Sequence, residues 1–527
     1  QADQAGGAER RQDPGPRARS QVSSCSQVDQ FAGFWDTRLA DRVGIGESST
    51  AATRASGTTM LSIFDHQRTM DRRSMMTAGG LALGGISLAD LLRTQAVAGG
   101  REKPIRTGKS VVFLLQHGGP TQFETFDPKL DVPDRIRTVG GVVQTSQPGV
   151  TFGSTMSGLA KWAHRMAIVR SYTSGSASHS LRPLIGKASR KANIGTLFSR
   201  LAGANDPKTG LPSNVTLFPN TIEPGALGPD ERFGKFNQTG EINSAYSAFT
   251  PGGGSTLQEN MKLRLPAKRF DDRAALLKSL DGLRRDIEQS GAAEGFDKYR
   301  QQAFEIVLRG VADAFDLSRE DPRTIARYDT ADFIDEDRYS GVSNGGSARR
   351  WYQNNAQTLG RELLLARRLC EAGCGFVTVA TRFVWDMHAD RNNLDVTRGM
   401  EAVGRPFDHA VSAFIEDCEE RGLSDDILLV CVGEMGRTPR INNNGGRDHW
   451  AGLAPLMLYG GGITDGQIVG QSTRDGGEPL ADRTDSDNLV ATILHTLLDI
   501  SELRLRSELP TNLVDFATSG TPIRHLA

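Results

Sequence analysis

The fold is decided by residues 407–434, FDHAVSAFIEDCEERGLSDDILLVCVGE, in which a helix pattern runs directly into a buried strand. The apolar spacing predicts a helix over Phe407–Arg421 that ends at Gly422. Ile427–Val432 is a continuous apolar run of strand length. Polar residues begin again at Gly433, where the strand ends.

The same alternation extends in both directions along the chain. Further helices are expected at Leu359–Ala372, ending at Gly373, and at Asp487–Leu498, with Ser486 as N-cap. A long polar loop is expected between the strand at Ile427–Val432 and the next one. The other strands are expected at Ser110–Gln116, Met166–Val169, Val215–Phe218, Phe376–Ala380 and Pro455–Tyr459. Such alternation predicts right-handed crossovers, and therefore a doubly wound, mainly parallel α/β sheet with helices on both faces.

Length and composition fit a globular protein. With 527 residues, the chain is long enough for one large domain or two smaller ones. The formal net charge of −1 makes nucleic acid an improbable partner, because no excess of positive charge attracts phosphate. The five cysteines are scattered and indicate no disulfide framework. Cys370 and Cys374 are interpreted as core residues.

The first hundred residues are expected to lie outside the folded domain. Residues 1–59 show no apolar period and are interpreted as a disordered or spurious extension. Residues 60–98 contain Arg72-Arg73, a short Gly-rich apolar stretch and Ala96-Val97-Ala98, the layout of a twin-arginine signal peptide. This predicts export to the periplasm or the cell exterior. Residues 99–527 form the domain, with a helical insertion at about 220–357, and no segment has the length of a membrane span.

Polar residues suited to metal follow two strands and precede a third. Asp386 and His388 follow one strand, Glu434 follows the next, and Asp448 and His449 precede the strand at Pro455–Tyr459. In extended backbone, Asp386 and His388 point to the same side, so both would reach one cation. Asp448 and His449 would diverge on a strand, but an Asn/Gly-rich loop can turn both inward. Ligands in doubly wound sheets bind beyond the carboxyl ends of the strands, where these residues should converge.

Other candidates have an equally plausible structural role. His117, Glu124 and Asp127 follow the first strand and would be either further ligands or loop braces. Ser180 is a candidate nucleophile in a Ser-rich loop. Arg437 would be either a surface residue or a donor to a tetrahedral oxyanion.

Several motifs resemble those of one family of secreted proteins. The Arg-Arg leader, LLQHGGPTQFETFDPK, FVTVATRFVWDMH, GEMGRTPRINNNGGRDHW, LYGGGITDGQIVGQS and DRTDSDNLVATILHTLLDI are similar to motifs of the domain of unknown function 1501 family, common in planctomycete-type bacteria. The resemblance runs from about Arg72 to Leu498. It implies an alkaline phosphatase-like fold of the alkaline phosphatase and sulfatase superfamily. It also implies that Asp386 with His388, and Glu434 with His449, fill neighbouring metal positions, with Asp448 as a ligand or just behind one.

The chemistry implied by the resemblance is metal-dependent hydrolysis of phosphate or sulfate esters, on a small-molecule or polysaccharide-linked substrate. Zinc, manganese, magnesium and calcium all stay open as the metal. A formylglycine sulfatase is not expected, because no cysteine begins the required C/S-x-P-x-R pattern and Ser180-Leu181-Arg182-Pro183 has Arg and Pro in reverse order. The alternatives are a non-catalytic secreted binding protein that retains the fold, and a metal-dependent mutase or transferase.

Overall fold

The computed structural model describes residues 63–65, 68–70, 103–252, 311–342 and 348–526. The chain divides into two units, residues 1–100 and 101–527. In the first unit, β1 (Ile63–Asp65) and β2 (Arg68–Met70) pair antiparallel. The expected extension at 1–59 and Arg72-Arg73 lie outside the described residues.

A seven-stranded sheet forms the centre of the second unit, in the order β14-β6-β13-β10-β3-β9-β8. Neighbouring strands are parallel except on both sides of β13, which alone runs against the others. The bounds are β3 Ser110–Leu115, β6 Met166–Val169, β8 Asn214–Leu217, β9 Phe376–Ala380, β10 Ile427–Val432, β13 Leu456–Gly460 and β14 Ile468–Val469. The predicted mainly parallel sheet is therefore confirmed, with each predicted strand placed to within one residue.

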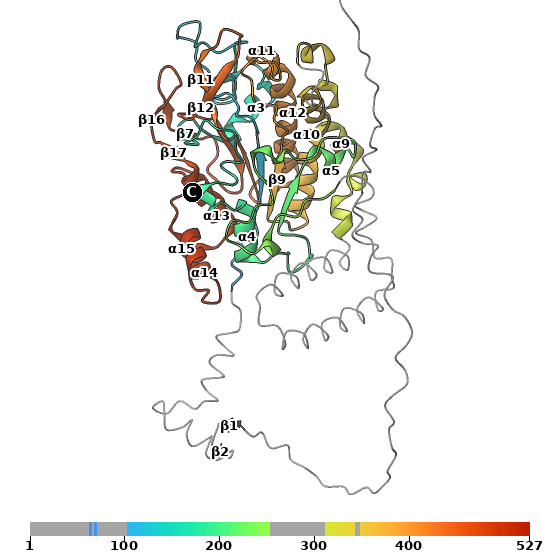
Figure 1. Cartoon of the computed structure of the whole chain (residues 1–527), viewed down its shortest axis with the longest axis vertical. Coiled ribbons are helices and arrows are strands. Elements are labelled where there is room, and N and C mark those ends of the chain that lie inside the picture. The colour runs from blue at the N-terminus through green and yellow to red at the C-terminus, as the bar shows by residue number, and fades with distance from the viewer. Residues whose placement is uncertain (1–62, 66–67, 71–102, 253–310, 343–347, 527) are drawn as a thin grey trace, which may run out of the picture. The chain divides into compact units, whose positions relative to one another are not determined.

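Helices cover both faces of this sheet (Figure 1), as predicted. One face packs against α3 (Ser157–Trp162), α10 (Ala348–Glu371) and α12 (Arg405–Arg421). The other packs against α4 (Ile194–Ala202), α13 (Ser486–Leu497) and α15 (Thr511–Ser519). The other α-helices in the described part of the chain are α5 Pro219–Ile222, α9 Pro322–Tyr328, α11 Val396–Gly399 and α14 Ile500–Arg504. No described helix combines the length and apolar character that crossing a membrane requires.

Helix boundaries follow the capping residues. Gly422 ends α12 in the left-handed conformation with φ 69°, as predicted. The prediction of Ser486 as the cap of α13 is wrong, because the Asp485 side chain accepts the backbone N–H groups of Asp487 and Asn488. Asp485 is also held in extended backbone by the short pairing of β17 (Thr484–Asp485) with β7 (Tyr172–Thr173).

Two further predictions need correction. The expected long polar loop after β10 contains a hairpin of β11 (Gly436–Ile441) and β12 (Arg447–Trp450). Helix α10 begins eleven residues before the predicted start, at Ala348 rather than Leu359. The other short pairs are β4 (Val142–Gln144) with β5 (Thr151–Gly153), and β15 (Gln471–Ser472) with β16 (Pro479–Ala481).

The expected insertion at 220–357 is described only in part. Its described residues hold α5, α9, the start of α10 and several turns of 3-10 helix. The charged helices predicted at Lys268–Gln289 and Asp297–Asp316 lie mostly outside the described residues. Cys370 and Cys374 are buried free thiols, which confirms their interpretation as core residues.

Helix α10 carries a buried carboxyl group, that of Glu362. Glu362 is 2% exposed, and its one hydrogen-bond donor among the described residues is the Thr358 hydroxyl. Burial raises the pKa of Glu362 to about 8. The unfolded chain releases this proton near pH 4.5, so ionisation favours unfolding at neutral pH.

We therefore predict a pH-dependent stability difference for Glu362→Gln. The wild-type protein loses unfolding free energy relative to the variant as pH rises from about 4.5 to 8, because only the unfolded wild type ionises in this range. The difference reaches roughly 5 kcal/mol, from about 1.4 kcal/mol for each pH unit between the two pKa values. Urea titrations between these pH values measure it, with the exposed carboxylate variant Asp425→Asn as control. A difference that stays constant with pH would contradict the prediction.

Candidate metal centre

The centre lies where three neighbouring parallel strands end. Leu115 of β3 pairs in register with Ala380 of β9 and with Val432 of β10. The three strands therefore end at the same edge of the sheet. Because β13 is antiparallel, its first residue, Leu456, also lies at this edge, opposite Val432. The three strand exits and the β11–β12 hairpin therefore approach one another, as the sequence predicted.

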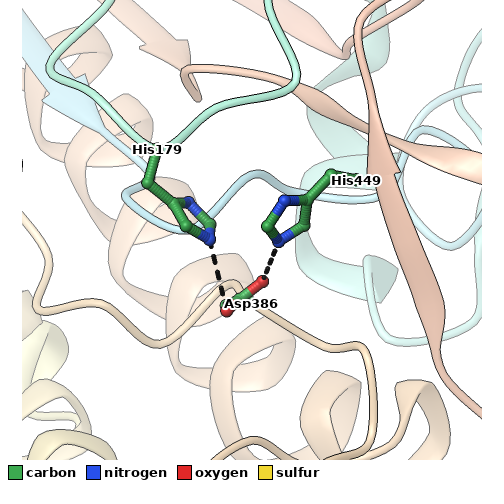
Figure 2. Close-up of side chains that lie close together, drawn as sticks. All are labelled: His179, Asp386 and His449. Carbon is green, nitrogen blue, oxygen red and sulfur yellow. Dashed lines mark hydrogen bonds and ion pairs between the residues drawn. The ribbon is translucent and has the colours of Figure 1, made fainter.

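Asp386 is the residue on which these segments converge. Its carboxylate lies 3.4 Å from Nε2 of His179, 3.0 Å from Nε2 of His388 and 3.1 Å from Nε2 of His449. Nη2 of Arg437 donates to it at 2.7 Å. Figure 2 shows the rings of His179 and His449 pointing at the carboxylate from two different segments.

Electrostatics keep Asp386 ionised. Burial alone would raise the pKa of Asp386, but hydrogen bonds from the three imidazoles and the charge of Arg437 hold this pKa well below its usual value. Burial lowers the pKa of His179, yet its hydrogen bonds to Asp386 and Glu434 outweigh that effect and raise it. The hydrogen bond to Asp386 likewise raises the pKa of His388.

The Nδ1 atoms of two imidazoles face acceptor oxygens on the side away from Asp386. Nδ1 of His449 lies 3.1 Å from the carbonyl oxygen of Ala177, which only accepts, so Nδ1 carries the proton. Nδ1 of His179 lies 2.9 Å from Oε1 of Glu434. Each ring therefore turns Nε2 toward Asp386. This is the arrangement in which neutral histidines offer a lone pair to a cation.

Glu434 is placed by the glycine turn after β3. The N–H of Gly118 donates to both carboxylate oxygens of Glu434, at 3.0 and 3.1 Å. Gly118 has φ +116°, and a Cβ there would lie 2.5 Å from the backbone nitrogen of Asp386. Only glycine permits this approach. The carboxylate of Glu434 is completely buried and supports His179 rather than meeting Asp386.

Arg437 has neither of the roles expected from the sequence. Its side chain is completely buried rather than on the surface. Nε donates to the carbonyl oxygen of Gly119 at 2.8 Å, and Nη1 donates to the carbonyl oxygen of Arg447 at 3.2 Å. Nη2 donates to Asp386 and to the carbonyl oxygens of Gly118 and Trp385. With its donors engaged in this way, the guanidinium braces the centre and is not directed at an oxyanion.

The other predicted residues lie around the centre or apart from it. The ring of His117 is buried among Phe233, Phe236 and Phe383, and burial lowers its pKa. The carboxylate of Glu124 forms a buried ion pair with Arg447. Asp127 pairs with Lys129 and Arg170 and accepts from Ser472. Asp448 diverges from His449 on β12, is exposed, and accepts from Asn442. The Ser180 hydroxyl accepts the backbone N–H of Arg182 at 3.3 Å.

His179 is the residue of the centre that sequence reasoning missed. It lies in the Ser-rich loop after β7, next to Ser180, the residue that the sequence pattern favoured. The available signal was its type, because the chain has only nine histidines and this one follows a strand. Among the described residues, His179, Asp386 and His449 offer ligand atoms within 4.8 Å of one another.

Comparisons with known proteins identify the family. A family model described as a protein of unknown function, DUF1501, matches residues 108–523. The chain belongs to the DUF1501 family. No match is found among curated proteins.

Several solved structures are similar to this DUF1501 protein at low sequence identity. The PsFucS1 sulfatase from Pseudoalteromonas sp. is 10% identical, with 77% of this chain and 70% of that chain covered and a TM-score of 0.32. The phosphonate monoester hydrolase of Agrobacterium radiobacter is 11% identical, with 79% and 78% covered and a TM-score of 0.29.

The buried brace yields a second prediction. Arg437→Lys keeps the charge but cannot reproduce the fork of donors to Asp386 and the surrounding carbonyl groups. We expect a loss of about 3 kcal/mol in unfolding free energy, the usual cost of breaking a buried charged network. Urea denaturation measures it. The matched control is Arg440→Lys on the same strand, where the side chain is exposed; equal effects of the two changes would contradict the bracing role.

Proposed function

We propose that His179, Asp386 and His449 hold a divalent metal ion, with His388 as a further ligand, and that the protein is an exported hydrolase of phosphate or sulfate esters. The observation that carries the proposal is the convergence of three Nε2 atoms on one ionised, buried carboxylate, at 3.0 to 3.4 Å. Imidazoles close to one carboxylate satisfy it either as protonated cations or by sharing a metal ion with it.

The surroundings favour the metal. The Nδ1 atoms of His179 and His449 already face an acceptor, so the neutral form of each ring carries its proton on Nδ1 and presents the Nε2 lone pair toward Asp386, where it could bind a cation. Three nitrogen ligands and a carboxylate suit zinc or manganese better than magnesium or calcium, which prefer oxygen ligands. Asp386 and Glu434 would supply the negative charge that offsets the ion.

Ester hydrolysis is a reaction that such a centre would support. A bound divalent cation supplies stabilisation for the negative charge that develops on an ester oxygen. Glu434 holds the His179 ring through Nδ1, while Phe383 and Phe233 pack against it at ring-centroid distances of 4.3 and 5.4 Å. These apolar rings exclude water from one side of the centre. Ser180, next to His179, remains the candidate nucleophile.

Two observations favour the alternative of a non-catalytic binding protein. Arg437 has its donors engaged with backbone carbonyls and Asp386, so it does not stabilise an oxyanion. The Ser180 hydroxyl accepts a backbone hydrogen bond from Arg182 and contacts no described base. Under this reading the metal organises a binding surface in the same fold.

Metal content and turnover on the full chain separate these functions. We expect about one equivalent of zinc or manganese per chain, falling more than tenfold in Asp386→Asn and His449→Ala because each removes a ligand. The exposed His525→Ala is the control. Elemental analysis and hydrolysis of p-nitrophenyl phosphate and sulfate provide the readouts. Metal without turnover supports the binding protein, and absence of bound metal in the wild type rejects the centre.

If Ser180 is the nucleophile, Ser180→Ala loses at least about a thousandfold in kcat, because the covalent step has no replacement. Its metal content should stay unchanged, since the hydroxyl is not one of the proposed ligands. Steady-state kinetics and elemental analysis on the same preparation test both statements. Unchanged kcat would assign the attack to another group.

Export is tested at the paired arginines of the leader. Replacing Arg72 and Arg73 together by lysine should retain the protein in the cytoplasm, because twin-arginine transport depends on that pair. Cell fractionation followed by immunoblotting measures the distribution. The control replaces Arg101 and Lys103 by glutamine, outside the expected signal. Unchanged export of the double-lysine variant would contradict the twin-arginine route.

A further inference from the structure

A pocket adjoins the loop that carries His179. Its volume is about 250 Å³. Part of its lining is Thr173 and Ser174, from β7 and the residue after it, and another part is Asp485, where β17 leads into α13. Arg182, from the loop after β7, also lines it. Since one water molecule occupies about 30 Å³ in the liquid, the pocket has room for an anionic group together with part of the molecule that carries it.

The loop after β7 joins this pocket to the metal centre. The carbonyl oxygen of Ala177 lies 3.1 Å from Nδ1 of His449, and His179 is itself one of the proposed ligands. Ser174 and Arg182, which flank these two residues along the chain, line the pocket instead. His179 and Arg182 are three residues apart, so their Cα atoms lie at most about 11 Å from each other. A single ligand can therefore extend from the metal centre into the pocket.

More cationic than acidic side chains line the pocket. The cations are Arg182, Lys187 and Arg483, and the acids are Asp485 and Asp487. No hydrogen bond or ion pair joins the side chain of any of the three cations to another described residue. The carboxylate of Asp485, in contrast, accepts two backbone N–H groups of α13, at 2.9 and 3.2 Å. The uncompensated positive charges favour an anion in the pocket.

Arg182 is the cation best suited to bind that anion directly. It is half-buried, whereas Lys187 and Arg483 are exposed. Its stem lies close to Gly186, where a Cβ would come within 3.2 Å of Cγ of Arg182. A guanidinium group presents a fork of donors that matches two oxygen atoms of one phosphate or sulfate group. The two exposed cations add attraction that salt screens.

We propose that this pocket binds a second anionic group of the substrate whose ester reaches the metal centre. The substrate is then a polyanion, with the reacting ester at one position and a further sulfate or phosphate group at another. Arg182 holds the second group through its guanidinium, and Lys187 and Arg483 contribute charge. The substrate role rests on the proposed ester hydrolase, whereas binding of the second group does not depend on turnover.

Titration calorimetry on the full chain compares ligands with one and two anionic groups. The pairs are D-glucose 1-phosphate with D-glucose 1,6-bisphosphate, and D-galactose 6-sulfate with D-galactose 2,6-disulfate. In the wild type, the second group should lower Kd at least about tenfold for one pair or both, because it gains charged hydrogen bonds. The ratio of the two Kd values should fall below about threefold in Arg182→Gln.

A second variant guards against misfolding of the first. Lys187→Gln combined with Arg483→Gln changes only exposed side chains and should also lower the Kd ratio, by at least about twofold. The matched control is Arg323→Gln, which removes an exposed cation of α9 outside the pocket lining and should keep the wild-type ratio. A ratio near one in the wild type for both pairs, or a ratio that both pocket variants leave unchanged, would overturn the proposal.

Inorganic phosphate and sulfate distinguish a substrate group from a free anion. If either binds as tightly as the doubly charged ligand and loses that affinity in Arg182→Gln, the pocket is a site for a free anion and the proposal is wrong. Release of phosphate or sulfate from the same ligands separates the two proposals. A ratio that depends on Arg182 without turnover supports the pocket and rejects the hydrolase, while turnover without such a ratio rejects the pocket alone.

Discussion

The buried negative charge of Asp386 is the constraint on which the centre depends. A carboxylate that is 2% exposed must be compensated from within the protein, because water cannot solvate it. The chain supplies four groups for this: His388 two residues further along the same loop, His179 from the loop after β7, and Arg437 and His449 from the β11–β12 hairpin. Arg437 must then be buried, and Gly118 and Gly119 must be glycines so that their carbonyl groups can reach it. The positions of Arg437, Gly118 and Gly119 therefore all follow from the need to compensate the charge of Asp386.

The sheet holds the residues that compensate this charge in fixed positions. Since β10, β3 and β9 are parallel neighbours in register, their exits hold His117, Asp386 and Glu434 on rigid supports. The reversed strand β13 serves the same end. By entering the sheet at the carboxyl edge, it keeps the preceding β11–β12 hairpin, and with it His449, beside Asp386. A parallel strand at that position would have required a crossover and placed its preceding residues at the other edge.

Strands could be predicted closely from the sequence because each is a short, fully buried and mainly apolar run. That Asp386, His388 and His449 lie together at one edge could be predicted from the rule that binding sites in such sheets lie beyond the carboxyl ends of the strands. The roles of Arg437 and Asp448 could not, because they depend on a hairpin whose strands are polar and lack an apolar signal. His179 escaped for a related reason: the short pairing of β7 with β17, distant in sequence, directs its loop toward the centre.

The separation of these residues along the chain also governs when the centre can form. His179, Asp386 and His449 belong to segments joined only through the completed sheet, so the cluster has a high contact order and no short fragment contains it. Loop-closure entropy must be overcome for each long-range pairing before the ligands meet. Binding of the proposed cation would therefore be a late event in folding, and only a chain with a completed sheet would bind it. An export route that accepts only folded proteins would carry the centre across already assembled.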